Sequence, residues 1–195
     1  LEARGWTVTV GAAASPRHTI FATGATPAVT LHGDAGGVIT LASSGYRLTT
    51  ATDGWRVVGA RLYVPAGGAA TLPSTVTLAL YSTAYATQLD LATVAPLRTV
   101  VAAVVDGWVS ADFGTPYAPA VGATERVWVG YTFGDAHYIT VDGAPPSTIT
   151  ASDGSPVKFA DTAEAGFGRA VYRIGSGGIN QSDNTYALDF VWDEG

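Results

Sequence analysis

Bulky apolar residues recur at every second position in short runs along most of the chain, and this pattern limits the fold more than any other feature. Residues 76–81, 126–133 and 186–192 are the clearest examples, and such runs are typical of strands that bury one face. No window of about a dozen residues keeps the i, i+3, i+4, i+7 apolar spacing of an amphipathic helix. The sequence therefore predicts an all-β protein.

Turn signals separate these runs at short intervals, as expected for a sandwich or a barrel rather than a parallel α/β sheet. Asp53-Gly54 precedes a strand at residues 55–64, and Asp106-Gly107 is expected to join residues 97–105 and 108–113 in a hairpin. The 24 glycines and 10 prolines agree with many tight connections. We expect a two-sheet antiparallel β-sandwich of the jelly-roll kind.

The first 40 residues differ from the remainder. Residues 6–10 alternate like a strand, whereas residues 11–17 are rich in Ala, Ser and Pro and resemble a linker. We therefore expect an extended N-terminal arm or adaptor over residues 1–40 and the sandwich domain over residues 41–195. Residues 142–156 and 175–184 are expected to be polar surface loops. Since the chain has no Met, it is interpreted as an excised or processed fragment.

Composition argues against several classes of partner. The formal net charge is −6, and Lys158 and nine scattered arginines form no basic stripe, so nucleic acid is not expected. The absence of cysteine excludes disulfides and thiolate metal sites. No run approaches the roughly 18 apolar residues of a membrane span, so membrane insertion is not expected either.

The segment from Gly54 onward resembles a β-sandwich family of unknown function that occurs in bacterial secreted or surface proteins and in actinobacteriophage minor tail proteins. The resemblance lies in VGARLYVP (58–65), VTLALY (76–81), GWVSADFGTPY (107–117), WVGY (128–131) and YALDF (186–190). It implies a structural or recognition role in an extracellular location, with no catalytic residues to carry over. Residues 1–40 lie outside the resemblance.

Catalytic groups are hard to assemble from the sequence. Asp189 lies inside the last strand with parity opposite to Leu188 and Phe190, so we expect it on a solvated outer face rather than as a general acid. Most other acidic residues lie beside Gly, Ser or Asn in predicted turns, where Asp binds the local backbone. No Gly-x-Ser-x-Gly motif is present. The chain is therefore not expected to be an enzyme.

Metal binding is considered at two sets of residues. His18, His32 and His137 match no zinc spacing. Calcium binding by loop carboxylates is the more plausible alternative, with Asp142, Asp153 and Asp183 as candidate ligands, although no loop has the repeated acidic spacing of a strong calcium motif. No other cofactor is predicted.

Exposed aromatic rings are the strongest remaining signal for binding. By parity, Trp108, Trp128, Tyr63 and Tyr81 lie opposite the apolar rows of their strands, and they form an outer aromatic strip if those strands are neighbours. Such a strip is either a platform that stacks sugar rings or a surface covered by the N-terminal arm or a partner. We favour the covered surface, since large apolar patches usually mark interfaces.

These observations predict a non-catalytic structural or recognition module of an extracellular assembly. The preferred assignment is a bacteriophage virion protein of the tail or surface that contacts other subunits, including copies of itself, or the host surface. The alternative is a carbohydrate-binding module of a secreted bacterial enzyme that binds a cell-surface glycan. A glycoside hydrolase is the second alternative.

Overall fold

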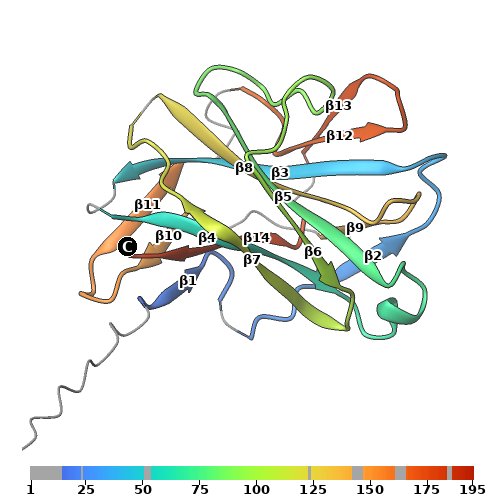
Figure 1. The fold of residues 1–195 in the computed structure, drawn as a ribbon, viewed down its shortest axis with the longest axis horizontal. Coiled ribbons are helices and arrows are strands. Elements are labelled where there is room, and N and C mark those ends of the chain that lie inside the picture. The colour runs from blue at the N-terminus through green and yellow to red at the C-terminus, as the bar shows by residue number, and fades with distance from the viewer. Residues whose placement is uncertain are drawn as a thin grey trace, which may run out of the picture.

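Two antiparallel sheets pack face to face in the computed structural model, which describes residues 15–22, 24–50, 54–122, 124–141, 147–160, 166–183 and 186–195 (Figure 1). Fourteen strands and one short 3₁₀ helix, η1 (Gly68–Ala70), make up the regular structure of this part of the chain. The prediction of an all-β antiparallel fold is confirmed.

The smaller sheet has four strands. Its order is β1 (Arg17–Thr19), β14 (Leu188–Asp193), β4 (Arg56–Val64) and β7 (Gly107–Tyr117). A register shift between Val57 and Gly59 marks a bulge in the pairing of β4 with β7. Both Val57 and Ala60 therefore point into the core, although strict alternation would place them on opposite faces.

The larger sheet has eight strands. Its main path is β10 (Thr148–Thr150), β11 (Pro156–Ala160), β3 (Ile39–Thr50), β8 (Glu125–Thr132), β5 (Thr75–Ala84) and β6 (Arg98–Ala103). The long strand β3 pairs with β8 on one edge, and on the other edge it pairs with β12 (Ala170–Ile174) and then with β11. β13 (Ile179–Ser182) extends the sheet beyond β12.

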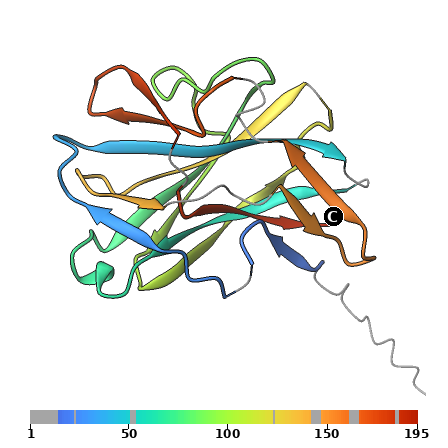
Figure 2. The same ribbon diagram turned by 180° about the vertical axis from the view of Figure 1, so that it is seen from behind.

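A separate two-stranded ribbon is formed by β2 (Val29–His32) and β9 (Tyr138–Val141). Seen from both sides, this ribbon and the β12–β13 hairpin lie at the same end of the molecule, where β3 begins (Figure 2). The chain passes between the two main sheets at β3–β4, β4–β5, β6–β7 and β7–β8. This crossing connectivity is that of a jelly-roll sandwich.

Alternating residues from both sheets form the main core, as the sequence pattern predicted. The members of this core include residues of β8 and β14 that face one another, each at 2% exposure or less. They are Val127, Val129 and Tyr131 of β8 and Leu188 and Phe190 of β14. Burying such apolar side chains contributes about 1.5–3 kcal/mol each relative to leaving them in water. A second, smaller cluster lies on the outer face of the larger sheet.

Three predictions about connections are wrong. Strands β6 and β7 do not form a hairpin: β6 pairs with β5 in the larger sheet and β7 with β4 in the smaller one. The predicted loop over residues 142–156 contains β10, and the predicted loop over residues 175–184 contains β13. Each strand is only three or four residues long, so alternation within it is too brief to detect.

The segment expected to be an N-terminal arm contributes strands to both ends of the fold. β1 pairs with β14, β2 pairs with β9, and β3 begins at Ile39. The predicted boundary at residue 40 therefore does not coincide with a break in the structure, and residues 1–14 lie outside the described residues. Within the described part, no helix is long and apolar enough to cross a membrane.

Candidate functional site

The four aromatic residues predicted to bind ligand form two pairs rather than one strip. Tyr63 of β4 lies opposite Trp108 of β7, and Tyr81 of β5 lies opposite Trp128 of β8. The first pair belongs to the smaller sheet and the second to the larger sheet. The pairs therefore lie on opposite outer faces of the sandwich, and the single strip predicted from strand parity does not exist.

Trp128 and Tyr81 are covered by the chain itself. Trp128 is 0% exposed and Tyr81 7%, and both pack with Leu89 of the β5–β6 loop and Val171 of β12. The indole Nε1 of Trp128 donates a hydrogen bond to Thr83 Oγ1 at 3.0 Å. These two rings are consequently core residues of a second apolar cluster and have no face open to a ligand.

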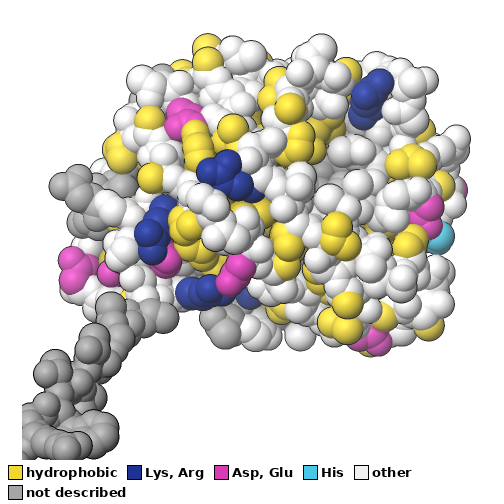
Figure 3. Space-filling view, in the orientation of Figure 1, with side chains coloured by type: hydrophobic (Ala, Val, Ile, Leu, Met, Phe, Trp, Pro, Cys, Tyr) yellow, Lys and Arg dark blue, Asp and Glu magenta, His cyan; other side chains and the backbone are white. Residues whose placement is uncertain are grey.

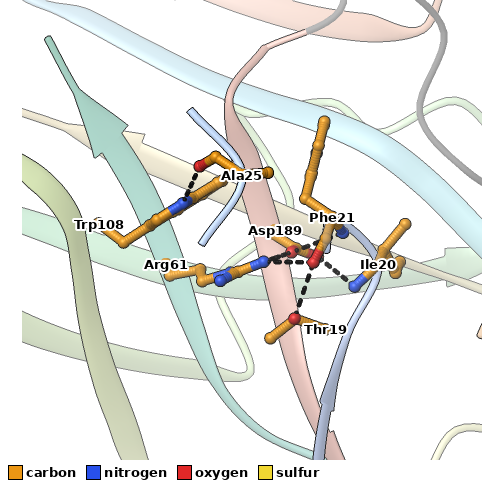
Figure 4. Close-up of polar contacts among 7 residues, drawn as sticks. All are labelled: Thr19, Ile20, Phe21, Ala25, Arg61, Trp108 and Asp189. Atoms are coloured by element: carbon orange, nitrogen blue, oxygen red, sulfur yellow. Dashed lines mark hydrogen bonds and ion pairs between the residues drawn. The ribbon is translucent and has the colours of Figure 1, made fainter. Parts of the chain in front are cut away.

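Trp108 and Tyr63 are half-buried and contact each other, and Trp108 also contacts residues that follow β1. The Trp108 indole Nε1 donates to the Ala25 carbonyl at 2.7 Å, and the ring lies 5.9 Å from that of Phe21 (Figure 4). The guanidinium of Arg61 stacks on the Trp108 ring at 3.9 Å from its centroid. Phe21, Ala25 and Arg61 therefore already contact the Trp108 side chain, on which the carbohydrate hypothesis would stack a sugar ring.

Asp189 is buried, contrary to the prediction of a solvated outer face. Its side chain is fully covered, and its Oδ2 accepts hydrogen bonds from Arg61 Nε at 3.0 Å and Nη2 at 2.7 Å (Figure 4). The backbone N–H groups of Ile20 and Phe21 also donate to the carboxylate. The predicted parity is correct, but Ile20 and Phe21 cover the face that it defines at Asp189.

This environment decides the ionisation of Asp189. Burial raises the pKa of its carboxyl group to about 6, and this outweighs the opposing effects of the Arg61 charge and the two backbone N–H donors. Since every donor points at the carboxylate from within the protein, the group connects β14, β4 and the segment after β1. The Asp189 carboxylate thus holds these three segments together.

Two further ion pairs lie on the same outer face. Arg17 contacts Asp112 at 2.7 Å, and Arg56 contacts Asp193 at 2.6 Å. Figure 3 shows side chains of opposite charge beside one another on the left half of the side of the molecule that it draws. Because these charges are paired, the face presents no concentrated field of one sign for a charged ligand.

Two of the three predicted calcium ligands lie among the described residues, in different loops. Asp153 is exposed and accepts a hydrogen bond from the Ser155 backbone N–H at 2.8 Å, which together with the Ser155 hydroxyl lowers its pKa. Asp183 is exposed next to β13, and Asp142 lies outside the described residues. No cluster of three or more His, Asp or Glu residues is present in the described ranges. Calcium binding stays a prediction.

A cavity of about 430 Å³ opens between the β2–β9 ribbon, the start of β3 and the β12–β13 hairpin. This is the best candidate site in the part of the chain that the structure describes. Its lining combines aromatic rings, hydroxyl groups, aliphatic side chains and one carboxylate. The lining residues are His32, Asp34, Ala35, Ile39, Tyr138, Thr140, Tyr172, Ile174, Ser182 and Tyr186.

The walls of the cavity are held by contacts across strands. The rings of His32 and Tyr138 stack with their centroids 4.5 Å apart and an interplanar angle of 11°, and His32 Nε2 lies 3.0 Å from Thr140 Oγ1. On the opposite wall the Tyr186 hydroxyl donates to Ser182 Oγ at 3.4 Å. Burial raises the pKa of the Tyr138 hydroxyl, and the Asp34 carboxylate and Tyr172 act in the same direction.

Tyr172 adds a further aromatic ring to the cavity and packs against the main core. It is half-buried on β12, and no other aromatic ring of the described residues stacks on it. Polar groups from β9 and β13 lie within the same lining. The site can thus combine ring stacking with hydrogen bonds from several directions.

None of these cavity residues was predicted as a site from the sequence. Their strands are short and distant in sequence, so their convergence depends on the pairing of β12 with β3 and of β2 with β9. One local signal was present: residues 170–174 and 179–182 flank the Gly-rich turn at 175–178, a hairpin pattern. Recognising that hairpin would have made Tyr172 a half-buried strand residue.

No family model and no curated protein matches the chain. Among solved structures, the chain is similar to the clostridial cysteine protease Cwp84 after propeptide cleavage, with a TM-score of 0.51 at 7% identity over 92% of this chain. A second structure holds the cysteine protease and lectin-like domains of Cwp84, a surface layer associated protein of Clostridium difficile. It has a TM-score of 0.44 at 7% identity and covers 82% of this chain and 33% of that one.

The chain spans 40% of the first of these structures. At this identity the likeness concerns the fold alone, and it agrees with the β-sandwich described above. The class defined here is therefore a two-sheet antiparallel β-sandwich module. The resemblance to the family of secreted and phage tail proteins stays a prediction from the sequence.

Proposed function

We propose that the chain is a non-catalytic recognition module of an extracellular protein, and that it binds a saccharide in the cavity between the β2–β9 ribbon and the β12–β13 hairpin. The observation that carries this proposal is the composition of the cavity lining, in which Tyr172 and the stacked pair His32–Tyr138 lie with hydroxyl and carboxylate groups. Sugars have an apolar ring face and a rim of hydroxyls, so they need both kinds of group.

The size of the cavity supports a small ligand. Its volume of about 430 Å³ lies within the roughly 300–1,000 Å³ that is common for small-molecule sites. Stacking on an aromatic ring removes apolar area from water at small entropic cost, because Tyr has few rotatable bonds. Thr140, Ser182 and Asp34 supply donors and acceptors for hydroxyl groups.

The proposal keeps the carbohydrate-binding alternative but places the saccharide in the cavity instead of on the outer Trp and Tyr residues. Trp128 and Tyr81 are buried, and Trp108 already contacts Phe21, Ala25 and Arg61. A place in a bacteriophage virion is compatible with glycan recognition but rests on the sequence resemblance alone. We do not propose hydrolysis at Asp189, since its carboxylate is buried in an ion pair.

The test is isothermal titration calorimetry with methyl glycosides and short oligosaccharides of the common hexoses. Wild-type protein should bind at least one of them, and Tyr172→Ala should weaken that binding by about tenfold, the loss expected for a stacking ring. Tyr63→Ala is the matched control, because Tyr63 is a half-buried tyrosine on the outer face of the smaller sheet.

Two outcomes would reject the proposal. One is the absence of binding to every saccharide of the panel. The other is binding that survives Tyr172→Ala but is lost in Tyr63→Ala. That result would show that the saccharide binds at the outer pair Tyr63 and Trp108.

A further inference from the structure

The lining of the cavity includes one acidic side chain, that of Asp34. Asp34 lies in the exposed connection between β2 and β3, and its carboxylate is near enough to Tyr138 to raise the pKa of that hydroxyl together with burial. No Lys or Arg is part of the lining. Among the lining residues, the Asp34 carboxylate therefore has no Lys or Arg side chain beside it.

Nearby cations of the described residues do not balance this charge. Arg173 follows Tyr172 on β12, so its side chain leaves the opposite face of the strand, and its Nε donates to the Gly177 carbonyl at 3.0 Å. His137 is paired with Asp135, with Nδ1 and Oδ2 2.7 Å apart. No ion pair involves Asp34 among the described residues.

We infer that Asp34 makes the cavity prefer neutral and amino sugars over acidic sugars such as uronic acids. This inference rests on the proposed function and adds the chemical class of its ligand. The Asp34 carboxylate can accept hydrogen bonds from sugar hydroxyls, and charge-assisted bonds of this kind are stronger than neutral ones. The same carboxylate repels a carboxylate on the ligand.

The size of the effect follows from Coulomb's law. Two unit charges about 6 Å apart at a partly exposed site, with an effective dielectric constant of about 40, change affinity by about tenfold. We therefore expect an acidic sugar to bind about tenfold more weakly than its neutral counterpart. An amino sugar that carries an ammonium group should bind at least as well as the neutral one.

The experiment compares methyl glucoside, methyl glucuronide and glucosamine, or the same three forms of whichever hexose binds best, by calorimetric titration at neutral pH and low salt. For wild-type protein we expect the order amino sugar, neutral sugar, acidic sugar. Asp34→Asn should bring the acidic sugar to within about threefold of the neutral one, since the amide keeps the size and most hydrogen bonds of the carboxylate.

Asp183→Asn is the matched control, because Asp183 is an exposed carboxylate beside β13 that does not line the cavity. It should leave the discrimination unchanged. Raising the salt concentration to about 1 M should also weaken the discrimination in wild-type protein, since the Debye length then falls to about 3 Å.

The outcomes separate this inference from the proposed function. If neutral and acidic sugars bind equally to wild-type protein, or if Asp34→Asn preserves the discrimination, the selectivity inference is wrong although saccharide binding stands. If none of the three forms binds, the proposed function itself fails.

Discussion

Arg61 on β4 and Asp189 on β14 form an ion pair on the outer face of the smaller sheet, with Nη2 and Oδ2 2.7 Å apart, and both side chains are buried, at 8% and 0% exposure. Part of the cover comes from Ile20 and Phe21, whose backbone N–H groups donate to the carboxylate. Arg61 Nη2 in turn donates to the Phe21 carbonyl at 2.6 Å. The pair therefore fastens the N-terminal segment to the sandwich.

Arg61→Met should strongly destabilise the protein. The substitution leaves the Asp189 carboxylate buried without its cation, and breaking a buried pair in this way costs about 3–5 kcal/mol. The measurement is urea denaturation at neutral pH. Arg17→Met is the control, because Arg17 and Asp112 form an exposed pair of a kind that contributes about 0–1 kcal/mol. Equal losses in the two variants would contradict the structural role of the buried pair.

The same carboxylate predicts a pH dependence of stability. Burial raises the folded-state pKa of Asp189 to about 6, above the value of about 3.9 for Asp in an unfolded chain. The folded state therefore binds this proton more tightly than the unfolded state. This contribution is fully present below about pH 4 and is lost as the pH rises through about 6.

Asp189→Asn isolates this effect from that of the other carboxylates. The unfolding free energy of wild-type protein minus that of Asp189→Asn should fall between about pH 4 and pH 6.5. Denaturation curves of both proteins at several pH values in this window provide the measurement. A difference that rises with pH would show that the ion pair lowers the folded-state pKa instead.

Asp189 also illustrates which parts of the structure the sequence could predict. Strand parity is a local property, and it correctly placed Asp189 opposite Leu188 and Phe190. Exposure is not local, because Ile20 and Phe21, which are 169 and 168 positions away in the chain, cover the carboxylate. The sequence therefore predicted the correct face and the wrong environment.

The aromatic pairs and the cavity show the same difference between local patterns, which the sequence predicts, and contacts between distant segments, which it does not. Local alternation identified the strands that carry Tyr63, Trp108, Tyr81 and Trp128, and each pair does lie on neighbouring strands. Which strands share a sheet depends on long-range pairing, which alternation does not encode. The cavity was missed for this reason, since it is formed where β2, β9, β3, β12 and β13 meet.

Gly130→Ala should destabilise the larger sheet. Gly130 lies on β8 between Ala42 of β3 and Ala79 of β5, and a Cβ at this position would lie 2.8 Å from the Leu41 carbonyl oxygen and 3.0 Å from Tyr81 Cε2. The neighbours are backbone and a packed ring, so we expect a loss of about 1–3 kcal/mol.

Thermal or urea denaturation measures this loss, with Gly178→Ala as the matched control. A Cβ at Gly178 meets no atom within 4 Å, and its backbone is outside the left-handed region. The control should change stability by no more than about 0.5 kcal/mol in the destabilising direction. Equal stability of the two variants would show that β8 can shift to make room.

Trp108→Ala should release the N-terminal segment without unfolding the sandwich. The indole holds the Ala25 carbonyl, contacts the Phe21 ring and stacks on Arg61. Its loss removes these contacts on the outer face, while the main core formed by residues such as Phe190 and Val129 is unchanged. Limited trypsin digestion reports the release, because Arg17 in β1 becomes accessible when this strand leaves β14.

The control for this last experiment is Leu89→Ala, which opens a space in the apolar cluster on the other face of the sandwich and should cost about 2–5 kcal/mol. If residues 17–25 are held locally, cleavage after Arg17 should be several times faster in Trp108→Ala than in Leu89→Ala. If cleavage instead follows global stability, the two rates will rank with the unfolding free energies. That result would mean that β1 opens only when the whole sandwich unfolds.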